Sequence, residues 1–146
     1  MHFHRFRLVN PTRLILALLL AAGSLALPSM APAATGGQGE PTIPPGVSLA
    51  SWFDNGHGGR YVLQLAKGRP LSPGAQVTGV VLSDSDCTPD AQGLNHCHNV
   101  IELADGSRVE VINNHQMMRN RCLGNGDRLT LRAVNANWMM GDLAAR

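Results

Sequence analysis

An Asp-Gly pair, Asp105 and Gly106, separates two short stretches in which apolar and polar residues alternate. Residues 98–104 precede the pair and residues 107–113 follow it, and Val and Ile are frequent in both stretches. Asp-Gly readily adopts the backbone of tight hairpin turns, and alternation with a period of two is typical of a half-buried strand. The sequence therefore predicts a β-hairpin at this place, and the rest of the fold must accommodate it.

The hydrophobic pattern selects the pairing between the two strands of this hairpin. A two-residue turn would pair His96 with His115 and gather three histidines on one face, but it would scatter the apolar residues over both faces. A three-residue turn with Gly106 in the left-handed conformation pairs Ile101 with Val109 and collects the apolar residues on one face. We favour this second register, because one face of such a sheet must be buried.

Further short strands are predicted on both sides of the hairpin. Alternation or enrichment in Val and Thr marks residues 60–66, 76–83 and 127–135, whereas residues 137–146 are too short to assign. Gly79 is expected at a bulge or bend at a barrel corner. Five short antiparallel strands without a long helix predict an all-β fold, a small five-stranded antiparallel barrel. An oligonucleotide/oligosaccharide-binding (OB-like) barrel is the first choice, and an SH3-like barrel is the second.

The first 34 residues have the features of an export signal. Three arginines precede an uncharged apolar run at residues 14–27, and small residues at 31–34 offer a cleavage site. The run is shorter than the roughly 20 apolar residues that a membrane-spanning helix requires. We therefore expect a cleaved signal peptide at residues 1–34 and a periplasmic or secreted protein that is not embedded in a membrane.

The remaining chain is expected to form one domain with a nearly balanced charge. Gly and Pro in residues 35–47 predict a flexible arm, and residues 48–146 are expected to form a single small β-barrel domain. Nine of the 12 Lys and Arg and all 10 Asp and Glu follow the leader, which gives a net charge of −1 with neutral histidines. Nucleic-acid binding requires a concentrated positive face. We therefore expect no nucleic-acid partner.

All three cysteines, Cys87, Cys97 and Cys122, follow the leader. An oxidising compartment favours their pairing, and because three is an odd number, one disulfide leaves one thiol over. The sequence leaves the three pairings open. Cys87 and Cys122 are the disulfide candidates that would leave Cys97 free as a ligand, whereas a Cys97–Cys122 bond would instead pin the hairpin to the following loop.

Soft metal-ligating side chains gather at the open end of the hairpin. The favoured register places Cys97, His115 and Met117 on the core side, and His96 and His98 on the outer side. Three or four such side chains could enclose one ion. Thiolate, thioether and imidazole ligands suit copper, with Cu(I) preferred, and zinc is the alternative. Additional candidate ligands are Met118, Met139 and Met140.

The C-terminal Trp138-Met139-Met140 segment, beside a small predicted barrel, resembles the periplasmic copper chaperones of Cus-type efflux systems. VTGVVLSDSD at residues 77–86 and GDRLTLRAVN at residues 126–135 are similar to strands of such barrels. In that family a five-stranded barrel binds Cu(I) through one histidine and two methionines, and a tryptophan covers the ion. The resemblance implies a soft-metal carrier. It assigns no individual ligand, because the tryptophan and the methionines are adjacent here and spaced in the family.

Together these features predict an extracytoplasmic protein that binds copper, or zinc, at a His/Cys/Met site. It would buffer the ion or exchange it with a metal donor or acceptor protein. The alternative is a disulfide-stabilised, non-catalytic β-barrel binding module of the cell envelope without a metal. We do not expect an enzyme, because an exported thiol tends to be oxidised and the chain has no CxxC motif.

Overall fold

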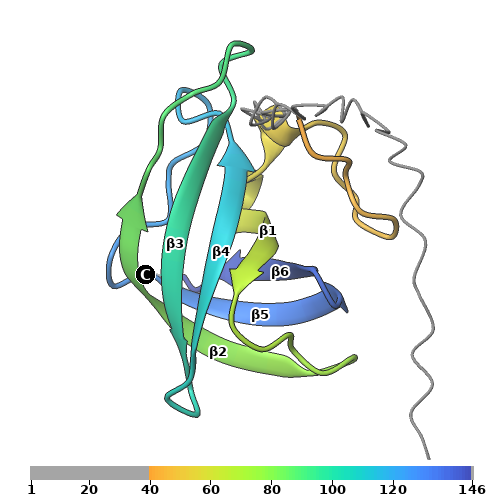
Figure 1. Ribbon diagram of the computed structural model, residues 1–146, viewed down its shortest axis with the longest axis vertical. Coiled ribbons are helices and arrows are strands. Elements are labelled where there is room, and N and C mark those ends of the chain that lie inside the picture. Colours follow the sequence, from red (N-terminus) through yellow and green to blue (C-terminus); the bar gives the residue numbers. More distant parts are fainter. Residues whose placement is uncertain (1–39, 146) are drawn as a thin grey trace, which may run out of the picture. The chain divides into compact units, whose positions relative to one another are not determined.

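Six antiparallel β-strands close into a barrel in the computed structural model, which describes residues 40–145 (Figure 1). The strands are β1 (Arg60–Lys67), β2 (Gln76–Ser85), β3 (Asn95–Leu103), β4 (Arg108–His115), β5 (Arg128–Asn135) and β6 (Trp138–Leu143). Within this range two short 3-10 helices, η1 (Trp52–Asp54) and η2 (His57–Gly59), precede β1, and neither is long and apolar enough to cross a membrane. The predicted all-β antiparallel barrel is confirmed, with one strand more than expected. The predicted signal peptide lies outside the described residues.

The additional strand is β6, in the C-terminal residues that the sequence pattern left unassigned. The strand order is β1-β4-β3-β2-β5-β6, and β6 pairs with both β5 and β1. Met139 of β6, for example, lies opposite Ala133 of β5 and Leu63 of β1. This double pairing closes the barrel, and closure removes the unpaired edges that an open sheet would expose.

The β3–β4 hairpin has the register that the hydrophobic pattern predicts. Ile101 pairs with Val109, and Gly106 adopts a φ of 82° in the turn. His96 consequently lies opposite Asn114, so the three-histidine face of the two-residue turn does not form. Ile101, Leu103, Val109 and Val111 point into the barrel, as a buried face requires, whereas Val100 and Ile112 lie on the outer face.

The barrel interior is apolar near the hairpin turn and polar at the opposite end. The apolar half contains Tyr61, Leu63, Val81, Ile101, Leu103, Val109, Val111, Leu123, Leu129, Leu131 and Met139. Burial of each large apolar side chain contributes roughly 1.5–3 kcal/mol to folding. The same face of β3 and β4 continues at the other end as Asn95, Cys97, Asn99, Asn113 and His115, all exposed by 6% or less. The buried Asn, Cys and His side chains of β3 and β4 thus lie at the end of the barrel opposite the hairpin turn.

A second hydrophobic cluster covers part of the outside of the barrel. Its buried residues are Trp52, Val62 and Leu94, and partly buried hydrophobic residues that pack against it include Trp138, Ile43 and Val47. The rings of Trp52 and Trp138 stack with their centroids 5.3 Å apart. The described part of the predicted arm therefore contributes apolar side chains to the packing of the domain.

Strand β2 passes from β5 to β3 at Gly79, which agrees with the bend expected there. Gly79 pairs with Leu103 of β3 on one side and with Leu129 of β5 on the other. A Cβ atom at this position would lie 2.6 Å from Ile101 Cγ2 and 3.3 Å from Leu131 Cδ1. Ile is stiff at χ1, so its side chain cannot easily withdraw. The corner therefore requires a residue without a side chain.

We expect Gly79→Ala to lower the free energy of unfolding by about 1–3 kcal/mol, because the added methyl group overpacks a filled corner. Urea denaturation at neutral pH measures the change. Gly124→Ala is the matched control, since the nearest atom to its added Cβ would be Asp127 Oδ2 at 3.8 Å, an ordinary contact. The control should stay within about 0.5 kcal/mol of the wild type. Wild-type stability of Gly79→Ala would show that the corner has room for a side chain.

Candidate metal centre

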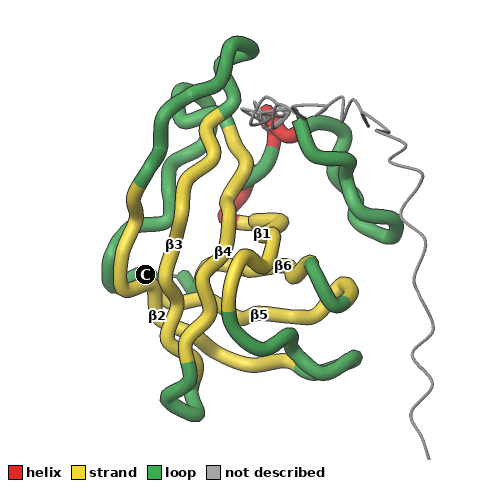
Figure 2. Tube along the Cα trace, in the orientation of Figure 1, coloured by secondary structure: helices red, strands yellow, loops and turns green. Residues whose placement is uncertain are grey.

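Three cysteines and one carboxylate meet at the polar end of the barrel. The metal-ligating atoms of Asp84, Cys87, Cys97 and Cys122 all lie within 4.8 Å of one another. We call these four residues the thiol cluster, and it includes every cysteine of the chain. They come from the end of β2, the β2–β3 loop, β3 and the β4–β5 loop (Figure 2). The cluster is therefore a product of the tertiary fold.

A disulfide joins Cys87 to Cys97, and Cys122 is the free cysteine of the described residues. This pairing replaces both the Cys87–Cys122 pair and the Cys97–Cys122 alternative considered from the sequence. The reason is an isolated antiparallel bridge between Pro89 and Asn95, which folds the β2–β3 loop back along the start of β3. Cys87 lies two residues before Pro89, and Cys97 lies two residues after Asn95. The two cysteines therefore face one another, with Cα atoms 4.1 Å apart.

The buried carboxamide of Asn99 connects the two flanks of the thiol cluster. Its Nδ2 donates hydrogen bonds to Asp84 Oδ1 (2.9 Å) and to the carbonyl oxygen of Leu123 (3.3 Å). Asp84 is thereby fixed at the end of β2, and the β4–β5 loop is fixed next to Cys122. Buried carboxamides that bridge separate segments in this way restrict the positions of those segments.

Asn95 fixes the β2–β3 loop from the same face of β3. Its Nδ2 donates to the carbonyl oxygen of Cys87 (2.7 Å), and its Oδ1 accepts a hydrogen bond from the backbone amide of Met117 (3.2 Å). The loop that carries Cys87 and the segment that follows β4 are therefore linked through one side chain. Asn95 and Asn99 of β3 thus position the β2–β3 loop with Cys87 and the β4–β5 loop with Cys122, respectively.

The β4–β5 loop is held by a buried acidic residue. Asp127 lies 2.8 Å from Arg121 in an ion pair and accepts a hydrogen bond from the Gly124 amide (2.8 Å). The Tyr61 hydroxyl donates to the Arg121 carbonyl oxygen (3.0 Å). These contacts lie on both sides of Cys122 in the sequence, so the free thiol has a defined position.

His115 lies on the inner face of β4 and is fully buried. Its Nδ1 donates to the Asn113 carbonyl oxygen (3.2 Å), and its Nε2 has no hydrogen-bond partner among residues 40–145. Burial lowers the pKa of His115, although the Asn113 carbonyl and the charge of Asp84 act in the opposite direction. A neutral imidazole with an available nitrogen lone pair is the form that binds metals. The predicted ligand His115 is therefore in a ligating form near Asp84, although it does not belong to the thiol cluster.

The free thiol is not activated as a nucleophile. Burial raises the pKa of Cys122, and the negative charge of Asp84 raises it further. Burial also raises the pKa of Asp84, while the hydrogen bond from Asn99 acts against this shift. A reactive cysteine requires the opposite environment, with positive charge that stabilises the thiolate. A bound cation would supply that charge.

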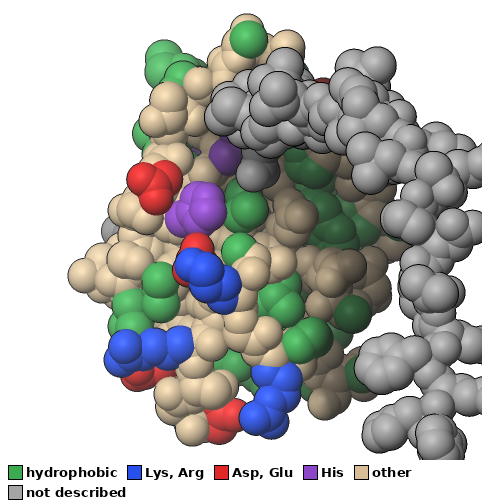
Figure 3. Space-filling model, viewed as in Figure 1, with side chains coloured by type: hydrophobic (Ala, Val, Ile, Leu, Met, Phe, Trp, Pro, Cys, Tyr) green, Lys and Arg blue, Asp and Glu red, His purple; other side chains and the backbone are tan. Residues whose placement is uncertain are grey.

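The two outward-facing histidines are engaged elsewhere. His96 lies between Asn114 Oδ1 (2.6 Å from its Nδ1) and Asp90 Oδ2 (3.2 Å from its Nε2). His98 Nδ1 lies 3.0 Å from Glu110 Oε1. Figure 3 shows histidine side chains among acidic and basic ones on the face that β3 and β4 form. Both predicted ligands therefore lie outside the thiol cluster.

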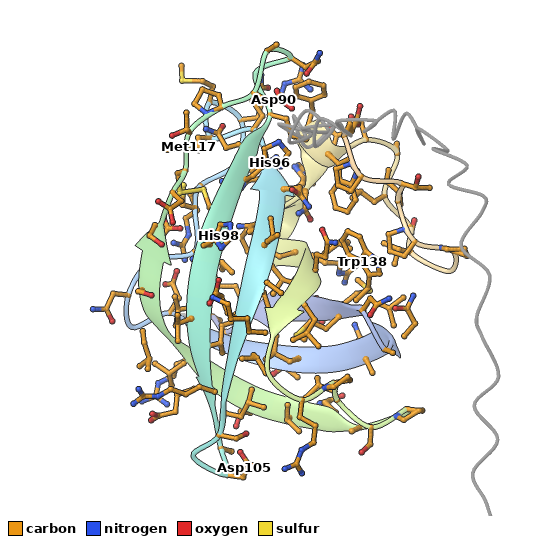
Figure 4. The ribbon with its side chains drawn as sticks, in the orientation of Figure 1. Asp90, His96, His98, Asp105, Met117 and Trp138 are labelled. Atoms are coloured by element: carbon orange, nitrogen blue, oxygen red, sulfur yellow. A yellow bond between two sulfur atoms is a disulfide. The ribbon has the colours of Figure 1, made fainter. Side chains whose placement is uncertain are left out.

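The methionines fall into two groups. Met117 and Met118 are exposed by 44% and 92%, beyond the end of β4, and Figure 4 shows Met117 at the end of the hairpin opposite Asp105. The expected core-side position of Met117 is wrong, because β4 ends at His115 and the chain then turns. Met139 is buried in the apolar core and Met140 is half-buried on the opposite face of β6. Neither of these two belongs to the thiol cluster.

Sequence reasoning missed Asp84 and Asn99 as parts of this site. A signal was available, because Asn95, Cys97 and Asn99 occupy alternate positions on the strand face that continues as Ile101. Polar residues on a face that must be buried require partners there. Their partners lie on other segments, which the pattern of a single strand does not identify.

We expect Cys122 in the disulfide-bonded protein to react slowly with iodoacetamide, with an apparent pKa above that of an ordinary cysteine. Asp84→Asn should lower this pKa and accelerate alkylation, because it removes a neighbouring negative charge. Mass spectrometry of alkylation rates against pH measures both. Asp86→Asn is the matched control, since asparagine also tolerates the positive φ of 54° at that position. A cysteine more acidic than a free one would contradict this environment.

We also expect buried His115 to make the protein less stable as the pH falls. Because the folded state has the lower His115 pKa, the unfolded state binds more protons below about pH 6.5, the usual histidine pKa. Stability should therefore fall with pH there, by at most about 1.4 kcal/mol per pH unit for one proton. Urea denaturation of the metal-free protein between pH 7.5 and 5.5 tests this. His115→Gln should show a flatter profile, and an unchanged profile would disprove the assignment.

The chain was also compared with known proteins. No protein-family model matches it, and no curated protein or solved structure shows significant similarity to it. Its function must therefore be argued from the residues of the site.

Proposed function

We propose that the chain is an extracytoplasmic protein that binds a soft metal ion at the thiol cluster in its reduced state. Cu(I) is the preferred ion and Zn(II) is the alternative. The observation that supports this most is the convergence of Asp84 and all three cysteines within 4.8 Å from four separate segments. Sulfur ligands of a tetrahedral site with Zn–S bonds of about 2.3 Å are roughly 3.8 Å apart. In the reduced protein the Cys87 and Cys97 sulfur atoms would have to move apart from bonding distance, and the more distant ligand atoms would have to move slightly closer, to reach that geometry.

The ligand set suits both ions in different ways. Three thiolates form the soft, anionic environment that Cu(I) prefers, and Asp84 would then remain a neighbour. Zn(II) accepts oxygen as well as sulfur and would take Asp84 as a fourth ligand. The buried Nε2 of His115 has no hydrogen-bond partner among the described residues but lies outside the thiol cluster, so it would serve as a ligand only after a rearrangement. The proposed site keeps Cys97 from the sequence prediction and replaces the other predicted ligands by Cys87, Cys122 and Asp84.

The proposed role is to buffer the ion or to exchange it with a metal donor or acceptor protein. Met117 has a soft thioether side chain that is 44% exposed, in the segment that Asn95 links to the Cys87 loop. A partner could therefore present or receive the ion at this rim. The environment of Cys122 favours its protonated form, which is not the nucleophilic thiolate that catalysis by a thiol requires.

The disulfide itself favours a second candidate function. A Cys87–Cys97 bond staples the β2–β3 loop to the barrel without any metal. The protein would then be a disulfide-stabilised binding module of the cell envelope that uses its rim loops. Metal loading of the reduced protein separates the two candidates.

We expect the purified, reduced protein to retain one Cu(I) or one Zn(II) per chain after desalting. Metal analysis measures the stoichiometry, and competition with a coloured chelator measures the affinity. Cys122→Ser should weaken binding by more than the roughly 10–100-fold typical of a lost outer-shell partner, because it removes a ligand. The melting temperature should rise with metal and fall again with chelator, since only the folded state holds the site.

Two further variants sharpen this test. Met118→Ala is the matched control, because its side chain is 92% exposed and does not belong to the cluster, and it should bind metal like the wild type. His96→Ala should also leave the affinity unchanged. A reduced wild type that retains no metal would exclude the proposal and favour the stapled module. Loss of metal binding in His96→Ala but not in Cys122→Ser would indicate that the outer histidines, and not the thiol cluster, hold the ion.

A further inference from the structure

The two sulfur atoms joined in the disulfide are also two of the three sulfur atoms of the proposed metal site. Metal binding requires thiolates, and a sulfur atom in a disulfide no longer carries the thiolate charge. Once Cys87 and Cys97 are bonded, the cluster retains Cys122 as its thiol and Asp84 as its carboxylate. Two such ligands fall short of the four that a closed zinc site uses and of the three thiolates proposed for Cu(I).

We infer that the Cys87–Cys97 disulfide and the metal ion are mutually exclusive states of one site, so that oxidation of these two thiolates releases the ion. This inference rests on the proposed metal-binding function and adds its regulation. The converse follows by linkage, because an ion that binds only the dithiol state must oppose formation of the disulfide.

The surrounding structure lets the site change state without a change of fold. Cys87 and Cys97 lie opposite each other next to the Pro89–Asn95 bridge, and the carbonyl oxygen of Cys87 is held by Asn95. Asn99 holds Asp84 through side-chain and backbone contacts that involve no cysteine sulfur. These contacts can persist in both states, so only the sulfur atoms need to rearrange.

The difference in exposure sets the order of events. Cys97 is fully buried, whereas Cys87 is half-buried and accessible from the loop. In the exchange with a small disulfide RSSR, the Cys87 thiolate attacks one sulfur, forms a mixed disulfide and releases one RS⁻. The Cys97 thiolate then attacks the Cys87 sulfur, forms the Cys87–Cys97 bond and releases the second RS⁻. Two electrons pass from the two thiolates to RSSR, and the ion leaves with its charge unchanged.

The test uses Zn(II), which has no redox chemistry of its own, so any oxidation occurs at sulfur. The purified, reduced protein is loaded with one equivalent of zinc and treated with glutathione disulfide. A coloured zinc indicator follows release, and peptide mapping by mass spectrometry identifies the disulfide. S-methylglutathione at the same concentration is the control for simple chelation, because it contains neither a thiol nor a disulfide.

We expect one zinc ion released per Cys87–Cys97 bond formed, with Cys122 still free, and recovery of zinc binding after reduction. Zinc should slow disulfide formation at least about tenfold relative to the metal-free protein, because both thiolates are engaged. Cys122→Ser retains both members of the switch, so its weaker zinc binding should still be abolished when the bond forms.

Three outcomes would overturn the inference, and they have different meanings. Zinc that stays bound after the Cys87–Cys97 bond has formed would disprove exclusivity while leaving the metal-binding function intact. Zinc release that accompanies a disulfide to Cys122 would show that the switch pair is wrong. A reduced protein that binds neither Zn(II) nor Cu(I) would refute both the inference and the proposed function.

Discussion

The register of the β3–β4 hairpin determines the rest of the structure. Ile101 lies opposite Val109, and because side chains alternate along a strand, this pair decides which side chains point into the barrel at every other position. Towards the loops, the same face carries Cys97, Asn99 and His115. A slip of one residue would bury His96 and expose Cys97. The apolar pairs of the hairpin thus determine which polar side chains at its other end point into the barrel.

This arrangement has an energetic cost at the polar end. Buried amides and imidazoles lose their hydration, and each polar group left without a partner costs roughly 1–3 kcal/mol. The hydrogen bonds of Asn95 and Asn99 offset much of this cost and position the loops that carry Cys87 and Cys122. Four buried side-chain atoms of the described residues still lack a partner, namely Asn99 Oδ1, Asn113 Nδ2, Asn114 Nδ2 and His115 Nε2. Unsatisfied buried polar atoms of this kind are more frequent where function outweighs packing.

The sequence predicts the barrel better than the site because the two depend on different kinds of information. Alternation within one strand, together with the Asp-Gly turn, was enough for the fold class and the hairpin register. Strand β6 lacks that alternation, since Gly141 stands on its inner face where Leu131 and Leu63 would each lie 3.2 Å from an added Cβ. The pairing of Cys87 depends on how a loop folds back, and Asp84 joins the cluster only through tertiary contacts. No pattern within one segment contains that information.

The disulfide and the proposed metal ion would each stabilise the folded domain, but not at the same time. A disulfide that closes a loop of 10 residues contributes about 3 kcal/mol by restricting the unfolded chain. A ligand that binds only the folded state contributes about 2.7 kcal/mol at a free concentration one hundred times its Kd. Either state can therefore stabilise the polar end, whereas the reduced, metal-free chain has neither contribution. Loss of the ion would therefore change the stability of the domain little when the disulfide forms in its place, because the two contributions are of similar size.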